Sequence, residues 1–329
     1  QNIANINTDG YKKRETALEE VTGAGGGVTE ISDQTGLGVR VEDIKRAFDQ
    51  FLIDKVRQTQ ALYQKADTYL DEVKSLENLL LPSDANLSNA IGEFFGSLQQ
   101  IAAAPDDQAP RIISIEKGKD LAGQFNLYSD RIDNLKEKIF DKANNAVTSV
   151  NLLSNQISTI NAKLLSSGSG NSSNALLDQR DILIDQLSEV CQISVRYINK
   201  GAAQVRLGNT GSGPVIVEPE SSVSAGTNQS PSTIPINVIK QGSRLQPVVG
   251  SGNVATNQIQ GGIIAGLVDA YALADDTLKE IDSLAELLSS KFNEINMSGL
   301  NLDGKKGGQM FPVSSLEAVE SPTNRSNVG

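Results

Sequence analysis

The feature that most strongly constrains the fold of this chain is the length of the stretches in which apolar residues follow the period of a helix. From Pro110 to Leu165, apolar residues recur at alternating spacings of three and four, which is the period of one helix face. At 1.5 Å per residue, about 55 residues in a single helix would extend roughly 80 Å. Similar spacing is found near residues 46–81, 87–101 and 258–299. These seams predict a mainly α fold, an elongated bundle of long heptad-patterned helices.

Each predicted helix has an apolar seam that should face the other helices. The first helix has Phe48, Leu52, Leu62, Ala66, Tyr69, Val73, Leu76 and Leu80, and the second has Leu87, Ile91, Phe94, Leu98 and Ile101. The third has Ile132, Leu135, Ile139, Ala146, Val150, Leu153, Ile157, Ile160 and Leu164. The last has Leu267, Tyr271, Ala274, Leu278, Ile281, Ala285, Leu288, Phe292 and Ile295, and ends at Gly299. Pro82 and Pro105 should end the first two helices.

A change of period marks a different kind of structure between about residues 190 and 257. The segment "SSGSGNSSN", Ser166 to Asn174, is expected to be a flexible connector, after which "ALLDQRDILIDQLSEV" returns to helical spacing. The alternating runs "QISVRYI" and "AAQVRLG" are separated by "NKGA", a pattern typical of a β-hairpin. Further β-type runs, "PVIV" and "IPINVIK", follow among Gly, Pro, Ser and Asn. The sequence therefore predicts a small β-rich insertion in the helical bundle.

The residue composition excludes several classes of function. With no histidine and a single cysteine, the chain lacks histidine-based catalytic triads, multi-cysteine metal sites and any internal disulfide. We interpret that cysteine, Cys191, as a small buried apolar side chain. A net charge of -11 and a pI near 4.7 argue against nucleic acid as a partner. No apolar stretch approaches the roughly 20 residues that a membrane span needs, so no membrane partner is expected.

Four motifs with some resemblance to known sites are interpreted as structural. "GLNLDGKK" at 299–306 lacks the Ser or Thr of a phosphate-binding loop and follows a helix, and "GAGGG" at 23–27 lacks the last Gly of a dinucleotide fingerprint. "NLDG" at 301–304 lacks the alternating acidic ligands of a calcium loop. In "LLDQRD", Arg180 should pair with Asp178 or Asp181 rather than leave a carboxyl group for acid–base chemistry. We therefore predict no catalytic, cofactor-binding or metal-binding residues, and no enzyme activity.

The N-terminal segment "NIANINTDGYKKRE" resembles the signature of bacterial flagellar rod, hook and hook-associated proteins. Asp9 stands where that signature commonly has Pro, and Asp also favours a turn. Three further segments, "GLGVRVEDIKRAFDQFLIDKVRQ", "LSNAIGEFFGSLQQIAAAPDDQAPR" and "ALLDQRDILIDQLSEVCQISVRY", follow in that order. Together they resemble the flagellar hook-associated protein 1 family across nearly the whole chain.

This resemblance implies a structural junction protein that joins the flagellar hook to the filament, without cofactors. Its implied partners are the hook protein, the next hook-associated protein, other copies of itself in a ring, and an export chaperone bound through a C-terminal part. It implies type III export and an extracellular location at the hook–filament junction. Family members extend beyond both ends of this sequence, so terminal helices are expected to be missing.

The resemblance also completes the expected domain organisation. Residues 1–35 would be the remnant of an N-terminal helix with a turn and a flexible loop, and 36–189 with 258–299 would form the long-helix rod domain. Residues 190–257 would be the β-rich inserted domain, and 300–329 a loop leading into the missing C-terminal part.

Two alternatives to the junction protein stay open. Flagellin or another hook-associated axial subunit shares the long heptad helices and the low aromatic content. "AFDQFLIDKVRQ" beside "GLGV" favours the junction protein. A helical enzyme or a helical periplasmic binding module is the alternative from a different class. It would need a concave pocket with convergent polar groups, which the sequence does not indicate.

Overall fold

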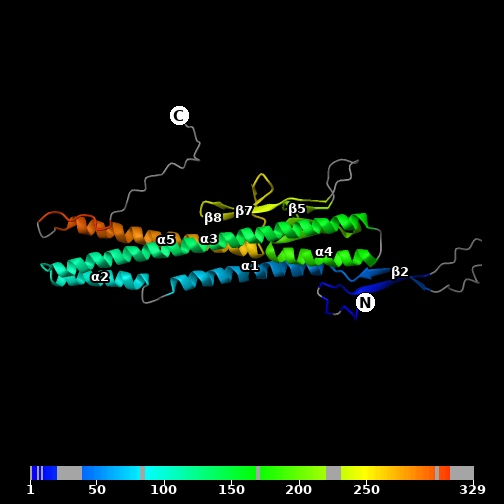
Figure 1. The fold of residues 1–329 in the computed structure, drawn as a ribbon, viewed down its shortest axis with the longest axis horizontal. Coiled ribbons are helices and arrows are strands. Elements are labelled where there is room, and N and C mark those ends of the chain that lie inside the picture. The colour runs from blue at the N-terminus through cyan, green and yellow to red at the C-terminus, as the bar shows by residue number, and fades with distance from the viewer. Residues whose placement is uncertain are drawn as a thin grey trace, which may run out of the picture. The chain divides into compact units, whose positions relative to one another are not determined.

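A computed structural model describes residues 2–5, 7–8, 10–20, 39–81, 86–167, 171–219, 231–300 and 304–311. The described residues contain five α-helices and nine β-strands, labelled in Figure 1. The helices are α1 (Gln50–Leu80), α2 (Leu87–Ala103), α3 (Gln108–Ser166), α4 (Asn171–Val190) and α5 (Ile263–Ser298). At 59 residues, α3 is the continuous long helix that its apolar repeat predicted. The prediction of a mainly α fold is confirmed.

The chain divides into two compact units. Unit 1 comprises Gln1–Ser75 and Leu135–Leu273, and unit 2 comprises Leu76–Asn134 and Ala274–Gly329. Helices α1, α3 and α5 each contribute residues to both units. The domain boundaries expected from the sequence, near residues 36, 190 and 258, stay a prediction.

Two helix starts differ from those expected. The predicted connector from Ser166 to Asn174 is partly helical, because α4 already begins at Asn171. Ser and Asn are good residues for a helix start, so a Ser/Asn-rich run is compatible with a first turn. Helix α5 begins at Ile263, five residues later than expected. Gly262 has a φ of 86° and a Cβ there would lie 2.5 Å from the carbonyl oxygen of Val190, so this position needs glycine.

The predicted seam of α3 is buried along its length. Ile132, Ile139, Val150 and Ile157 are at most 1% exposed. In the first half of α5, the predicted residues Leu267, Tyr271 and Ala274 are buried. In its second half the predicted residues are half-buried, and Ile295 is 68% exposed. The predicted Ile281, Ala285, Leu288 and Phe292 still pack against a buried cluster of Phe94, Leu121 and Phe125. The heptad pattern therefore identified the packed face of α3 and that of α5 except at Ile295.

Helix α1 buries only part of the face expected for it, since Leu76 is 5% exposed and Tyr69 and Val73 are half-buried. Leu52 and Leu62 of the predicted seam are 60% and 55% exposed. The inner face instead carries Arg57, Ala61 and Glu72, which are 4%, 1% and 4% exposed. Arg57 contacts Asp185 at 2.7 Å and Glu72 contacts Lys142 at 2.5 Å, so both inward charges have an opposite partner. The prediction was wrong for Leu52 and Leu62 because it counted apolar residues only, whereas a paired charge can also be buried.

Strands β1 (Arg14–Glu20) and β2 (Val39–Arg46) form an antiparallel hairpin. The sequence predicted a helix remnant, a turn and a flexible loop for residues 1–35, which include β1, and placed β2 in the long-helix rod domain. The exposed fractions of Leu18, Val39 and Val41 are 61%, 67% and 59%. A ribbon whose apolar side chains stay in solvent needs no clear alternation of apolar and polar residues. Periodicity therefore gave no signal for these two strands.

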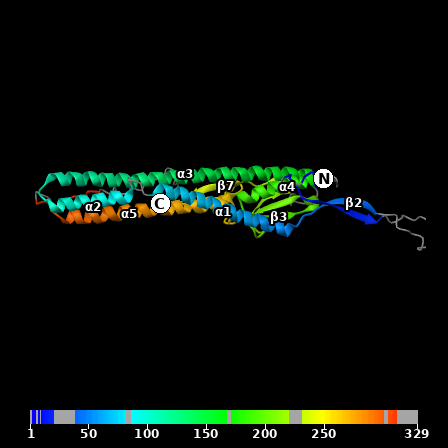
Figure 2. The same cartoon turned by 90° about the horizontal axis from the view of Figure 1, so that it is seen from below.

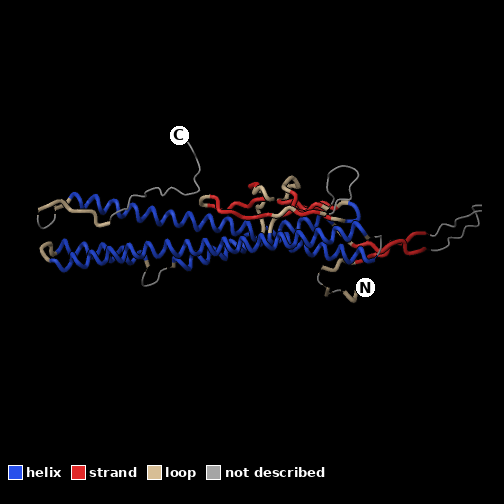
Figure 3. The backbone as a smooth tube through the Cα atoms, turned by 45° about the horizontal axis from the view of Figure 1, so that its top comes forward, coloured by secondary structure: helices blue, strands red, loops and turns tan. Residues whose placement is uncertain are grey.

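The β-rich segment of unit 1 forms two antiparallel sheets beside α3 (Figures 2 and 3). One contains β3 (Ile193–Tyr197), β4 (Ala203–Leu207), β5 (Val215–Glu218) and β6 (Ser232–Thr233). The other contains β7 (Ile236–Gln241), β8 (Arg244–Val249) and β9 (Val254–Ala255). The predicted hairpin is confirmed as β3 and β4, which pair from Ile193 with Leu207 to Tyr197 with Ala203. Lys200 and Gly201 make the turn with φ values of 54° and 76°.

Two asparagines of α3 bond this β-rich segment through its backbone. Asn161 donates to the carbonyl oxygen of Ala203 and accepts from its amide, both at 2.9 Å. Asn151 makes the same pair of bonds to Ile236, again at 2.9 Å each. A side-chain amide can imitate a strand partner in this way, because it offers one donor and one acceptor side by side. The first residues of β4 and β7 are therefore bonded directly to α3.

Candidate functional site

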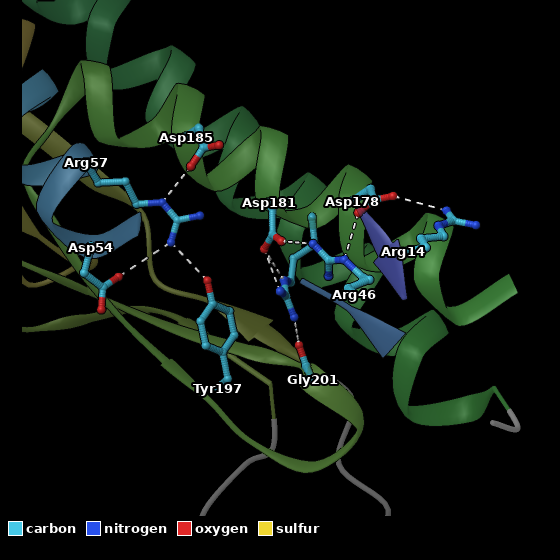
Figure 4. Close-up of polar contacts among 10 residues, drawn as sticks. Arg14, Arg46, Asp54, Arg57, Asp178, Asp181, Asp185, Tyr197 and Gly201 are labelled. Carbon is cyan, nitrogen blue, oxygen red and sulfur yellow. Dashed lines mark hydrogen bonds and ion pairs between the residues drawn. The ribbon is translucent and has the colours of Figure 1, made fainter. Parts of the chain in front are cut away.

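The most concentrated group of polar contacts joins the N-terminal hairpin to α4 (Figure 4). Asp178 and Asp181 lie three residues apart on α4 and face the base of the hairpin. From β1, Arg14 Nη2 lies 3.3 Å from Asp178 Oδ2. From β2, Arg46 Nε lies 2.9 Å from Asp178 Oδ1, and its Nη2 contacts Asp181. The side chains of Arg46 and Asp181 are 6% and 1% exposed, so these are buried ion pairs.

Arg180 extends the group toward the turn between β3 and β4. Its Nη2 lies 2.5 Å from Asp181 Oδ1, and its Nη1 donates to the carbonyl oxygen of Gly201. The guanidinium carbon lies 4.3 Å from the ring centre of Tyr197, which is cation–π distance. One arginine thus connects α4, the turn and β3.

Arg57 of α1 forms the other end of the group. Its Nε donates to Asp185 at 2.7 Å and its Nη1 to the Tyr197 hydroxyl at 3.0 Å, while Asp54 lies 3.7 Å away. Burial acts to lower the pKa of Arg57, but Tyr197 and Asp185 outweigh it and raise that pKa above the usual value. Burial raises the pKa of Tyr197 and of Asp54, with partial compensation by neighbouring arginines. Arg57 therefore stays charged and Tyr197 stays a neutral phenol at ordinary pH.

These contacts suit positioning rather than proton transfer. Each acidic side chain of the group has a guanidinium neighbour within ion-pair distance, so the carboxylates are engaged in contacts within the protein. The predicted pairing of Arg180 with Asp181 is confirmed. Asp178 and Asp181 share a face of α4, as residues at i and i+3 do. Arg14 and Arg46 were missed because the strands that carry them were not predicted.

Hydrogen bonds join the two ends of the N-terminal signature segment, which lies against α4. Asn2 donates to the carbonyl oxygen of Arg14 at 2.9 Å and accepts from its amide at 3.0 Å. The Tyr11 hydroxyl donates to the same Asn2 oxygen at 2.9 Å. Gly10 has a φ of 73°, and a Cβ there would lie 2.2 Å from Ile182 of α4. The Asn, Gly and Tyr of this segment therefore have internal, structural roles.

Cys191 follows α4 and is completely buried, as expected. Burial raises the pKa of its thiol to about 12. Since the thiolate is the reactive form, a thiol with this pKa is unreactive at neutral pH. The interpretation as a small apolar core residue is confirmed.

The loop motifs lie largely outside the described residues. This holds for all of "GAGGG" at 23–27 and for residues 301–303 of the segment 299–306. Leu300 and Lys306 form an isolated antiparallel bridge. In the part of the chain that is described, no three His, Cys, Asp or Glu side chains gather in a way that could hold a metal ion. Within the same residues, no helix has the length and apolar content to cross a membrane.

An apolar cavity of about 560 Å³ lies in unit 2. Among its lining residues are Phe94, Leu121, Phe125, Phe292, Met310 and Phe311. Phe94 packs against Phe292 and Phe311 with ring centres 5.1 and 5.7 Å apart. The Asn293 side chain of α5 accepts hydrogen bonds from the backbone amides of Met310 and Phe311, both at 3.0 Å. These bonds hold the segment that contains Met310 and Phe311 against α5. The polar lining residues of the cavity include Lys119, Asn126 and Glu286, which are exposed, and no described polar side chain of the lining is buried where it could fix the orientation of a ligand.

Comparison with known proteins identifies the family. The model of the flagellar hook-associated protein FlgK helical domain matches residues 73–311, well over half of the chain. The chain belongs to this family. Flagellar hook-associated protein 1 of Bacillus subtilis is 26% identical over 96% of this chain, and that of Salmonella typhimurium is 25% identical over 98%. The Escherichia coli protein of the same name is 24% identical over 99%. The chain spans 66%, 57% and 59% of the lengths of these relatives, respectively.

A solved structure supports the fold of this FlgK-family chain. The flagellar hook junction protein FlgK from Burkholderia pseudomallei matches with a TM-score of 0.66 and 23% sequence identity. The match covers 79% of this chain and 47% of the Burkholderia chain. At this identity the likeness establishes the fold, and the buried ion pairs described above are properties of the present chain.

Proposed function

We propose that this protein is a structural subunit of the bacterial flagellum that joins the hook to the filament. The observation that carries the proposal is the family match over residues 73–311, made by a chain whose relatives are named flagellar hook-associated protein 1. The pairing of the Asp178 and Asp181 carboxylates with Arg46 supports a structural rather than a catalytic role.

The proposed partners follow from this role. They are the hook protein on one side, the next hook-associated protein on the other, and further copies of the same subunit arranged in a ring. We also propose an export chaperone, a route through the flagellar type III apparatus, and a final position outside the cell. No cofactor is needed, because the role consists of binding neighbours in a fixed geometry.

The experiment that tests the proposal is gold labelling of intact flagella with an antibody raised against this chain. A junction protein should give a single band of label where the hook meets the filament. The matched control is the same antibody after absorption with the purified chain, which should remove the band.

Each other labelling pattern points to a different protein. Label along the whole filament would indicate flagellin, and label at the distal filament tip would indicate another hook-associated subunit. Label in the periplasm would indicate a binding module. In a strain without the natural gene, cells should shed filaments into the medium, and the restored gene should stop that loss.

A further inference from the structure

The hairpin formed by β1 and β2 is ion-paired to α4 at its base. Arg14 and Arg46 are the first pair of its register and stand opposite each other on the two strands. Both reach Asp178, and Arg46 also reaches Asp181. The exposed fractions of these four side chains lie between 1% and 13%. Each strand is therefore attached to α4 by at least one ion pair that is largely shielded from solvent.

The hairpin register is interrupted just beyond this base. Ala17 pairs with Asp43, whereas Leu18 pairs with Val41, so one residue of β2 has no partner. Such a β-bulge locally breaks the hydrogen-bond ladder and bends the strand. Four pairs lie on the side of α4 and three lie beyond the bulge.

The part beyond the bulge has little apolar support. Leu18, Val39 and Val41 are each more than half exposed. The ion pair between Arg40 and Glu19 is also in solvent, with exposed fractions of 66% and 46%. Exposed pairs contribute little to stability, and an unsupported two-stranded ribbon is marginally stable in water. The backbone ladder is the main described contact of this distal part.

We propose that Asp178 and Asp181 form an electrostatic clamp that sets the direction of the hairpin on unit 1, with the β-bulge acting as a hinge beyond the clamp. The clamp is specific because both carboxylates lie on one face of α4 and meet arginines from both strands. Losing Asp178 leaves Arg14 without this acidic partner and Arg46 with Asp181 alone. The hairpin should then loosen while the helices of unit 1 stay folded. This inference does not depend on the role in the flagellum.

The first test compares Asp178→Asn with the parent by hydrogen–deuterium exchange. The amides of β1 and β2 should exchange at least about tenfold faster, and those of α3 and α4 should change less than about twofold. The matched control is Glu137→Gln, which removes the exposed pair with Lys240 elsewhere in unit 1 and should change neither group.

A general rise in exchange across α3 and α4 would overturn the clamp, because Asp178 would then stabilise unit 1 as a whole. Unchanged exchange in the hairpin would overturn it too. If Asp178→Asn does not fold, Arg14→Gln removes the same contact from the hairpin side. Failure of both variants to fold would likewise show a general rather than a local role.

The second test measures hinge motion with spin labels at Val39→Cys and Lys163→Cys, with Cys191 protected by burial. The distance distribution should broaden at least about twofold in Asp178→Asn and narrow when Glu42 is deleted, because that deletion restores a regular register. A distribution that Glu42 deletion leaves unchanged would refute the hinge, and one that Asp178→Asn leaves unchanged would refute the clamp.

Discussion

Replacing Asn161 by Ala should destabilise the protein more than any exposed substitution on α3. The Asn161 side chain is completely buried, and it provides both hydrogen-bond partners of the Ala203 backbone from α3. Alanine would leave one amide and one carbonyl group buried without these partners. It would also leave a small space beside β4.

The magnitude follows from these two groups. An unsatisfied buried donor or acceptor costs about 1–3 kcal/mol, so the pair should lower the free energy of unfolding by about 2–6 kcal/mol. That is a large fraction of the roughly 5–15 kcal/mol that keeps a typical domain folded. Asn145→Ala is the matched control on the same helix, because Asn145 is exposed and should change stability by no more than about 0.5 kcal/mol.

Urea unfolding followed by far-ultraviolet circular dichroism measures the difference. The midpoint should fall for Asn161→Ala, with a slope close to that of the parent, because the same surface is exposed on unfolding. Asn151→Ala should show a smaller loss, since Asn151 is only partly buried. A midpoint for Asn161→Ala equal to that of Asn145→Ala would refute the reasoning, since the bonds to Ala203 would then add nothing.

Three further predictions concern other parts of the two units. Cys191 should not react with Ellman's reagent in the native state at pH 8 and should react fully in urea, and rapid labelling of the native protein would disprove its burial. Because the pKa of its thiol is about 12 in the folded state and ordinarily 9.0, the free energy of unfolding should fall as pH rises from about 9 to 12. Gly266→Ala should lower the free energy of unfolding by about 1–3 kcal/mol, because the added Cβ would lie 2.6 Å from the Lys65 carbonyl oxygen. Gly92→Ala, which has open space around the added Cβ, should raise it by up to about 1 kcal/mol. Thermal unfolding that ranks the two variants the other way would contradict this packing. Phe311→Ala should lower the free energy of unfolding by about 2–4 kcal/mol and weaken the near-ultraviolet circular dichroism of the aromatic cluster in unit 2. An unchanged spectrum would show that Phe311 does not pack there.

Local sequence patterns were sufficient for the helices and for one hairpin. The spacing of apolar residues along α3 is a property of neighbouring turns, so it identified a helix of 59 residues and its buried face. Alternation and a Gly-containing turn likewise identified β3 and β4. Burial of Cys191 followed from residue type alone. Family membership was also readable, because it rests on ordered segments of sequence.

Contacts between distant residues were not predictable in this way. The inward face of α1 depends on Asp185 and Lys142, which lie far along the chain and make it possible to bury Arg57 and Glu72. A fully buried asparagine such as Asn161 looks like an ordinary polar helix residue until the backbone of β4 stands beside it.

The candidate site shows the same division. The sequence by itself determined that Asp178, Arg180 and Asp181 lie together on a helix and that Arg180 neutralises a carboxylate. Only the tertiary structure brought Arg14 and Arg46 to Asp178. Strands β1 and β2 are separated in the sequence and pair with each other, and the apolar side chains of Leu18, Val39 and Val41 stay exposed. Periodicity reports which side chains avoid water, and it carries no information about which charge, more than a hundred residues away, will neutralise another.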